Sequence, residues 1–144
     1  MSVRRARAED EDEIDGFAPA FDEALRPNEV ARFLADGRHH LLLGYLGDRP
    51  VGFLSAVEVF HPDKRAELFL NEIAVVEEAR RHGVARALIE ELKQIGRELG
   101  CSTVWVLTDG ANEPAMRLYA STGGAWDGTS QVMFEYGLDD ARAE

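Results

Sequence analysis

A short basic segment with one glycine stands between two apolar parts of the chain. The segment Arg80-Arg81-His82-Gly83-Val84-Ala85 follows a β-rich run and leads directly into an amphipathic helical pattern. The N-terminus of a helix presents backbone N–H groups without intrahelical partners, together with the positive end of the helix dipole. Guanidinium groups at the same place make these residue types suited to binding phosphate oxygens.

The pattern R-x-x-G-x-A is short, and a simpler interpretation is a glycine that tightens a turn beside exposed arginines. The strand before it and the well-patterned helix after it favour phosphate binding. The segment is not a P-loop, because Val84-Ala85 stand where lysine and a hydroxyl residue would follow the glycine. It is not a G-x-G-x-x-G dinucleotide motif either.

Hydrophobic periodicity predicts the elements that position this segment. We expect a helix after the acidic run 9–15, a second helix around 30–34, a long helix over 84–99 and another that Asn112 caps. Strands are predicted at 3–6, 41–46, 50–60, 67–76, 103–108 and 131–136. The second, third and fourth form an antiparallel meander, and 103–108 returns parallel to 67–76 after a helical crossover. Apart from Asn71 and Glu72, 67–76 is apolar, so we expect a central strand that is covered on both faces.

Length, composition and charge limit the classes of protein to which this chain could belong. A chain of 144 residues with 45% hydrophobic and 30% charged residues suits one domain over 1–144. The net charge of −11 argues against nucleic acid as a partner and permits a cationic small molecule. No apolar run is long enough to span a membrane.

The cysteine and histidine residues predict neither a disulfide nor a metal site. Cys101 is the single cysteine, which fits a buried thiol in a reducing cytoplasm, and the N-terminal stretch lacks the apolar core of a signal peptide. The histidines have no ligand-like spacing, so no metal is expected.

A second constellation, Asn112-Glu113-Pro114-Ala115-Met116-Arg117-Leu118-Tyr119 followed by Gly123-Gly124, reads by itself as a capped helix with an aromatic residue. Together with the basic segment, it resembles the GCN5-related N-acetyltransferase (GNAT) superfamily, whose members use acetyl-coenzyme A. More narrowly, the segments ELFLNEIAVVEEARRHGVARALI, DGANEPAMRLY and VMFEY are similar to type I aminoglycoside 3-N-acetyltransferases.

The resemblance implies an α/β (α+β) fold. Its sheet would be mixed and mostly antiparallel, with 6–7 strands, helices on both faces and a splayed parallel strand pair at the cofactor site. It also implies acetyl transfer to a primary amine of an aminoglycoside, the 3-amino group in the narrower group, with antibiotic resistance as the consequence. Members of this family often pair through a sheet edge or terminal strand, so a homodimer is one expectation.

The resemblance also assigns residues to the donor. The pyrophosphate of coenzyme A would lie over the basic segment and the first turn of the helix, and the pantetheine arm would lie along the strand before it. The implied cofactor-binding residues are Ile73, Ala74, Val75, Arg80, Arg81, His82, Gly83, Val84, Ala85, Arg86, Asn112, Ala115 and Tyr119. The family pattern often has glycine where Ala85 stands, and alanine is a small replacement.

Acetyl transfer from a thioester to an amine needs a proton acceptor, because an aliphatic ammonium has a pKa near 10. Glu72, just before the predicted pantetheine-binding backbone, is the candidate base, directly or through water. Tyr119 is the candidate acid for the leaving thiolate, and backbone N–H groups near Val75 would polarise the thioester carbonyl.

Carboxylates are the groups that an aminoglycoside would need for its ammonium groups. Asp109, Glu113 and Glu135, together with Glu72, are the candidate acceptor-binding residues. Two alternatives stay open. One is another amine acceptor, such as a protein N-terminus, a lysine, a polyamine or an amino-sugar metabolite, and the other is a coenzyme A-binding module without catalysis.

Overall fold

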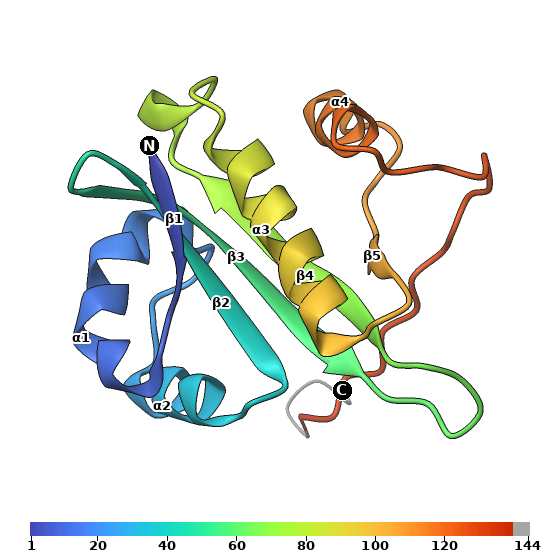
Figure 1. Cartoon of the computed structure of the whole chain (residues 1–144), viewed down its shortest axis with the longest axis horizontal. Helices are drawn as coiled ribbons and strands as arrows, with labels where there is room; N and C mark the ends of the chain where they lie inside the picture. Colours follow the sequence, from blue (N-terminus) through green and yellow to red (C-terminus); the bar gives the residue numbers. More distant parts are fainter. Residues whose placement is uncertain (140–144) are drawn as a thin grey trace. The chain divides into compact units, whose positions relative to one another are not determined.

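In the computed structural model, which describes residues 1–139, a five-stranded mixed sheet is the framework of the N-terminal part (Figure 1). The strands lie in the order of the chain, namely β1 (Ser2–Arg5), β2 (His39–Leu46), β3 (Arg49–Val59), β4 (Glu67–Val75) and β5 (Val104–Val106). The first four are antiparallel to their neighbours, and β5 runs parallel to β4. The predicted meander and the parallel return are therefore confirmed.

The β2–β3 hairpin closes where Leu46 pairs with Arg49. Gly47 has a φ of 59°, a left-handed conformation that suits a two-residue hairpin turn and that glycine adopts without strain. The turn thus sets the pairing at the start of the hairpin, and the register shifts between Gly44 and Tyr45.

The chain divides into two compact units, Met1–Asp109 and a second unit that begins at Gly110. The first unit contains the sheet and the helical segments η1 (Ala8–Asp10), α1 (Glu11–Ile14), η2 (Asp15–Ala20), α2 (Pro27–Ala35), η3 (Glu77–Ala79) and α3 (Val84–Leu99). In the second unit, α4 spans Glu113–Ser121. A single domain over residues 1–144 stays a prediction.

The first predicted helix is shorter and less regular than its apolar spacing suggested. A single α-helical turn, α1, continues as the 3₁₀ helix η2, which contains Pro19 and ends before Phe21. Proline lacks the N–H that an α-helix needs in its interior, so the regular helix does not extend to Phe21.

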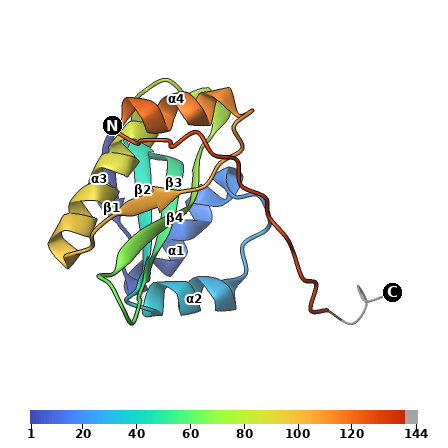
Figure 2. The ribbon, with the colours of Figure 1, turned by 90° about the vertical axis from the view of Figure 1, so that its right-hand side faces the viewer.

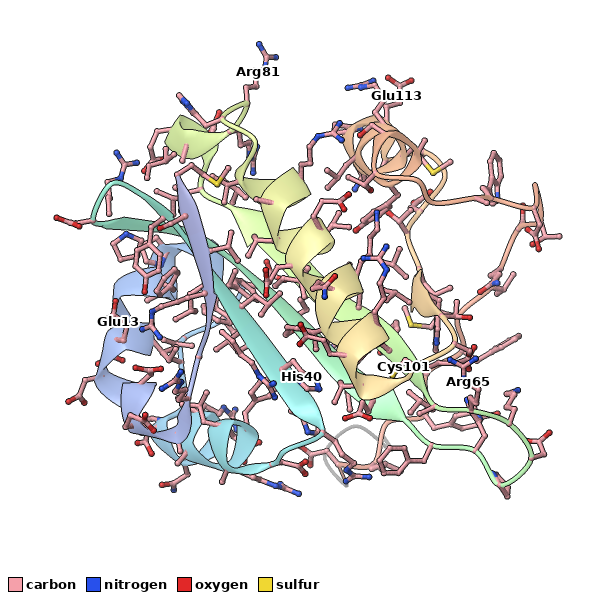
Figure 3. The ribbon with its side chains drawn as sticks, in the orientation of Figure 1. Glu13, His40, Arg65, Arg81, Cys101 and Glu113 are labelled. Atoms are coloured by element: carbon pink, nitrogen blue, oxygen red, sulfur yellow. The ribbon has the colours of Figure 1, made fainter. Side chains whose placement is uncertain are left out.

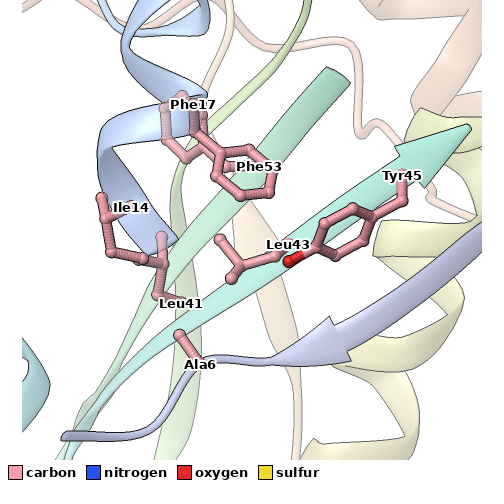
Figure 4. Close-up of a cluster of buried hydrophobic side chains, with 7 residues drawn as sticks. All are labelled: Ala6, Ile14, Phe17, Leu41, Leu43, Tyr45 and Phe53. Atoms are coloured by element: carbon pink, nitrogen blue, oxygen red, sulfur yellow. The ribbon is translucent and has the colours of Figure 1, made fainter. Parts of the chain in front are cut away.

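Helices cover both faces of the sheet in the first unit, as predicted (Figure 2). On one face, side chains of α1 and η2 pack with those of β2 and β3 and with the residue that follows β1 in a buried cluster (Figure 4), made up of Ala6, Ile14, Phe17, Leu41, Leu43, Tyr45 and Phe53. On the other face, Leu88 and Leu92 of α3 are fully buried. Gly44 of β2 permits this packing, because a Cβ there would stand 2.7 Å from the Val84 side chain.

The strand prediction fails at two places. The expected total of 6–7 strands is wrong for the described residues, because 131–136 forms no strand in them. The side chains of Val132 and Phe134 there are 78% and 81% exposed. A high β-propensity does not make a strand without a hydrogen-bonded neighbour. In addition, β4 is not covered along its whole length, since both Asn71 and Glu72 are exposed.

Candidate active site

The turn between β4 and α3 has an unusual backbone. Arg81 has a φ of 69° and Gly83 a φ of 80°, both in the left-handed region. Among non-glycine residues this conformation is uncommon, and it turns successive N–H groups toward one side. Arg81 projects away from the ribbon at this turn (Figure 3). The chain then enters α3 with Gly83 as the N-cap.

The N-terminus of α3 offers backbone donors to a ligand. Its first intrahelical hydrogen bond runs from the Ala87 N–H to the Gly83 oxygen at 3.0 Å. The N–H groups of Val84 and Ala85 therefore have no acceptor within the helix. No side chain of the described residues caps this end, and its first turn holds no acidic residue. The helix dipole favours an anion at this position.

Three further predicted residues lie in or beside this turn. The Arg80 Nε donates to the Val75 oxygen at 3.2 Å, so its guanidinium is held beside the end of β4. His82 is exposed, as is Arg86 in the first turn of α3. The basic residues of the predicted site therefore lie around one helix N-terminus, that of α3.

The edge of β4 that faces β5 is open along its C-terminal half. The parallel pairing covers Leu68, Leu70 and the residue between them, and it ends there although β4 continues to Val75. The Val76 N–H donates to the Val51 oxygen, which directs the even-numbered backbone groups at this end of β4 toward β3. Backbone groups of successive residues in an antiparallel strand point alternately to its two edges. The N–H and C=O groups of Ile73 and Val75 therefore point to the open edge.

Ala74 differs from its two neighbours. Its oxygen would lie 2.8 Å from a Cβ on Gly52 of β3, so its carbonyl faces the sheet and requires glycine opposite. Of the predicted pantetheine-binding residues on β4, Ile73 and Val75 therefore present backbone groups to the open edge, and Ala74 does not.

Glu72 reaches the surface because of a β-bulge. Ser55 pairs with Glu72 and Ala56 pairs with Leu70, so Asn71 is an extra residue without a partner in β3. The Glu72 side chain lies on the same face as Ala74, which packs against the cluster of Figure 4. Partial burial raises the pKa of the Glu72 carboxyl above its usual range, and the charge of Asp22 adds to this effect.

In the second unit, Asn112 caps α4. The Asn112 Oδ1 accepts a hydrogen bond from the Ala115 N–H at 3.2 Å, so two predicted cofactor-binding residues form the helix cap. Tyr119 is half-buried on the same helix, and burial raises the pKa of its hydroxyl. The Gly124 N–H donates to the Tyr119 oxygen at 2.8 Å and closes the helix.

The candidate acceptor-binding acids lie on different segments. Asp109 is exposed at the end of the first unit. Glu113 is exposed in the first turn of α4, with an oxygen 3.8 Å from Arg117. Glu135 is exposed in the segment 131–136, which lacks regular structure. Their convergence on one ligand stays a prediction.

Sequence reasoning missed Asp22 and Ser55. Asp22 affects the pKa of Glu72, and Ser55 stands opposite Glu72 in the sheet. Neither residue belongs to a recognisable motif. Only the strand register and the position of the segment after η2 identify them.

Residues 1–139 hold a recess outside the predicted site, but no metal-binding group and no membrane-spanning helix. A recess of about 710 Å³ beside β1, with Arg5, Arg7 and Leu34 among its lining residues, includes none of the predicted site residues. No group of His, Cys, Asp and Glu side chains within residues 1–139 is arranged to hold a metal ion. No helix in this range is both long and apolar enough to cross a bilayer.

The solved structure of a probable acetyltransferase shares this fold, with a TM-score of 0.79 and 25% identity, covering 96% of this chain and 100% of that one. The chain belongs to the acetyltransferase (GNAT) family, whose sequence model matches residues 5–123. It is therefore an enzyme of the acetyltransferase class, and this family uses acetyl-coenzyme A. Among curated proteins, no sequence matches it.

Solved structures of aminoglycoside acetyltransferases share its fold. One from an uncultured soil metagenomic sample, in complex with sisomicin, has a TM-score of 0.87 and 18% identity, with 96% of each chain covered. A second, HMB0005, also from an uncultured soil metagenomic sample, has a TM-score of 0.80 and 26% identity, covering 96% of this chain and 98% of that one. Aminoglycoside N-acetyltransferase AAC(6')-Iy in complex with CoA has a TM-score of 0.77 and 18% identity, covering 96% and 95%.

Proposed function

We propose that this enzyme transfers the acetyl group of acetyl-coenzyme A to a primary amine of an aminoglycoside. The observation that supports the donor assignment is the basic turn at Gly83, where the N-terminus of α3 has no side-chain cap, next to the end of β4 that has no partner in β5. The aminoglycoside assignment rests on the resemblance of the motifs and on the similarity to HMB0005 at 26% identity. The 3-amino position is the finer prediction, and the shared fold of AAC(6')-Iy favours neither position.

The proposed donor site uses the basic turn and the edge of β4. The pyrophosphate would accept hydrogen bonds from the N–H groups of Val84 and Ala85 and ion pairs from the arginines of the turn. The pantetheine amides would pair with the backbone groups that Ile73 directs to the open edge. The Val75 oxygen accepts a hydrogen bond from Arg80, and the Val75 N–H would face the thioester oxygen. Asn112, Ala115 and Tyr119 complete the donor site by resemblance to the family.

In the proposed reaction, Glu72 accepts a proton from the acceptor ammonium, directly or through water. The free amine attacks the thioester carbonyl carbon, and the resulting oxyanion is stabilised by the Val75 N–H. The carbon–sulfur bond then breaks, and the Tyr119 hydroxyl protonates the leaving thiolate. The nitrogen loses its surplus proton to solvent as the amide forms, and solvent returns a proton to the Tyr119 phenolate and takes one from Glu72, which restores both groups. A raised pKa brings Glu72 closer to the range in which a carboxylate is an effective base.

The proposed acceptor groups are the carboxylates of Asp109, Glu113 and Glu135. All three side chains are exposed, and a net charge of −11 favours the approach of a polycation. Charge-assisted hydrogen bonds from ammonium groups are the interactions that such acids supply.

The proposal is tested by incubating the protein with acetyl-coenzyme A and a panel of amines, with release of free thiol as the readout. The panel contains sisomicin and gentamicin-like aminoglycosides, linear polyamines, amino sugars, and peptides with a free N-terminus or a lysine. We expect aminoglycosides to give the highest kcat/KM, with the acetylated nitrogen identified by NMR of the product. Turnover of peptides or polyamines alone would replace the aminoglycoside assignment and leave the acetyltransferase assignment in place.

We also propose that the protein forms a homodimer. The segment after Gln131 exposes a run of large apolar side chains, with Tyr136 at 87% and Leu138 at 93% exposure. Several large apolar side chains exposed in one segment are characteristic of an interaction site. Sedimentation equilibrium should give twice the mass of the chain, and a Phe134→Asp variant should shift the equilibrium to the monomer.

A further inference from the structure

Two polar residues stand side by side on the face of the sheet that carries η2. Ser55 of β3 and Glu72 of β4 are direct partners in the antiparallel ladder. Such partners project their side chains on the same face, with Cβ atoms about 4.5–5.5 Å apart. In the neighbouring pair along the ladder, Phe53 belongs to the buried cluster (Figure 4), and its partner Ala74 packs against that cluster.

A third polar residue, Asp22, enters from the segment after η2. Phe21 stacks on Phe53 with ring centroids 3.9 Å apart and an interplanar angle of 13°. This contact fixes the chain above the pair next to Ser55 and Glu72, and Asp22 is the following residue. After burial, the charge of Asp22 is the second cause that raises the pKa of Glu72, so the two carboxylates lie within electrostatic reach.

The two carboxylates have no cation beside them. Within residues 1–139, no lysine, arginine or histidine side chain forms an ion pair with Asp22 or Glu72. A like charge nearby destabilises the ionised form of the Glu72 carboxyl. An external cation would remove this repulsion.

The Ser55 hydroxyl points to a ligand independently of the acids. Its side chain is 5% exposed, and its Oγ has no hydrogen-bond partner among the described residues. A buried hydroxyl normally has a partner, because leaving it without one is costly. A hydroxyl can accept a hydrogen bond from an ammonium while it donates to a carboxylate.

We propose that Asp22, Ser55 and Glu72 form a site for two ammonium groups of one acceptor, which makes the enzyme selective for compact polyamines over monoamines. This inference rests on the proposed function. Glu72 receives the reacting ammonium and takes its proton. Asp22 binds a second ammonium that stays charged, and Ser55 orients the reacting nitrogen through its hydroxyl.

The substitution Asp22→Asn tests the second ammonium site, with Glu23→Gln on the same segment as the control. Steady-state kinetics are compared for sisomicin, 1,3-diaminopropane and propylamine. We expect Asp22→Asn to raise KM for both polyamines roughly tenfold and to leave KM for propylamine within about twofold of its wild-type value. The kcat values for all three amines should change together, because the charge of Asp22 also raises the pKa of Glu72. An equal rise in KM for propylamine, or an unchanged KM for the polyamines, would overturn the inference.

Direct binding separates this inference from the proposed function. Calorimetric titration of sisomicin into the protein does not require turnover. If the wild-type protein acetylates no amine but binds sisomicin in a manner that depends on Asp22, the proposed reaction fails and the ammonium site stands. If it acetylates sisomicin and Asp22→Asn matches the wild type, the ammonium site alone fails.

Ser55→Ala tests the hydroxyl, and Thr122→Val provides a matched control. The Thr122 hydroxyl is satisfied, since it donates to the Leu118 and Tyr119 oxygens at 2.9 and 3.1 Å. We expect Thr122→Val to lower Tm, because it removes existing hydrogen bonds. Ser55→Ala should leave Tm unchanged or raise it, while KM for sisomicin rises about fivefold. A lowered Tm for Ser55→Ala with an unchanged KM would assign the hydroxyl a structural role and contradict the inference.

Discussion

Ser55 stands directly opposite Glu72 in the β3–β4 ladder, although the next residue of β3, Ala56, stands opposite Leu70. The extra residue, Asn71, reverses the alternation of side chains along β4. Leu68 and Leu70 are buried on the face that α3 covers. If Asn71 took a regular place in the ladder, Glu72 would lie on that same face, and its carboxylate would be buried among leucines. With the bulge, Glu72 lies on the opposite face and is exposed.

Deletion of Asn71 should therefore remove the bulge and leave Glu72 on its present face. Glu72 would then follow Leu70 directly, and the two side chains would still project to opposite faces, with Ser55 and Ala56 as their partners. We expect the free energy of unfolding in urea to change by less than about 1 kcal/mol.

Deletion of Ile73, which pairs with Leu54, is the comparison and should cost roughly 3 kcal/mol or more, because it reverses the alternation of the residues that follow. Equal losses in the two variants would show that Asn71 is not an extra residue in the ladder.

Replacement of the candidate base and an acceptor-binding acid should separate catalysis from donor binding. In the double variant Glu72→Gln, Glu135→Gln, acetylation of aminoglycosides should be lost, because both the proton acceptor and a charged contact are removed. Coenzyme A affinity, measured by calorimetry, should stay within about twofold of the wild type, since neither residue belongs to the proposed phosphate site. Glu77→Gln, in the exposed segment η3, is the control. Normal turnover in the double variant would remove Glu72 from the mechanism.

Tyr119→Phe should lower turnover more than it lowers donor affinity. The substitution removes the hydroxyl proposed to protonate the leaving thiolate and keeps the half-buried ring. We expect kcat to fall by 10²-fold or so, as for other general acids, with the Kd for coenzyme A changed little. Retention of full turnover would show that the acid role of Tyr119 is wrong.

Arg81→Asn should weaken donor binding without loss of stability. Asparagine tolerates the left-handed backbone at this position, where φ is 69°, so the substitution removes the guanidinium without backbone strain. The Kd for coenzyme A should rise roughly tenfold, and its dependence on salt should become weaker. Arg32→Gln, on the exposed face of α2, is the charge-matched control. A Kd that is unchanged at low salt would argue against phosphate binding by Arg81.

His40 should make the stability of the protein depend on pH. The side chain is 1% exposed, and its pKa is lowered from 6.5 to about 4, mainly by burial and then by the charges of Arg5 and His39. The Glu58 oxygen lies 3.6 Å from the Nε2 atom, too far for a hydrogen bond. The unfolded chain therefore binds a proton below pH 6.5 that the folded protein takes up only near pH 4.

Stability should fall as the pH drops through this window, by roughly 3 kcal/mol in total. His40→Leu should flatten the acid limb of the unfolding free energy, measured in urea between pH 7 and pH 4. His82→Leu, at an exposed position, should leave that limb unchanged. An unaltered slope in the His40→Leu variant would show that other groups cause the acid sensitivity.

The sequence alone determined the elements whose signals are local. The glycines that end α3 and turn the β2–β3 hairpin, the amphipathic stripe of α3 and the cap at Asn112 each depend on residues only a few positions apart. The basic turn at Arg80–Ala85 was predicted for the same reason, since its strand, glycine and helix are contiguous. The parallel return of β5 also follows from chain order, because a crossover helix brings the next strand back in the same direction.

Only the tertiary structure decided what depends on register and on packing between distant segments. The bulge at Asn71 adds one residue and places Glu72 on the other face of the sheet. No pattern in the β4 sequence predicts this bulge. The approach of Asp22, the unpartnered hydroxyl of Ser55 and the open edge of β4 arise from contacts between separate elements. The segment 131–136 failed as a strand for the same physical reason. Its side chains favour β-structure, but a strand exists only where another strand completes its hydrogen bonds.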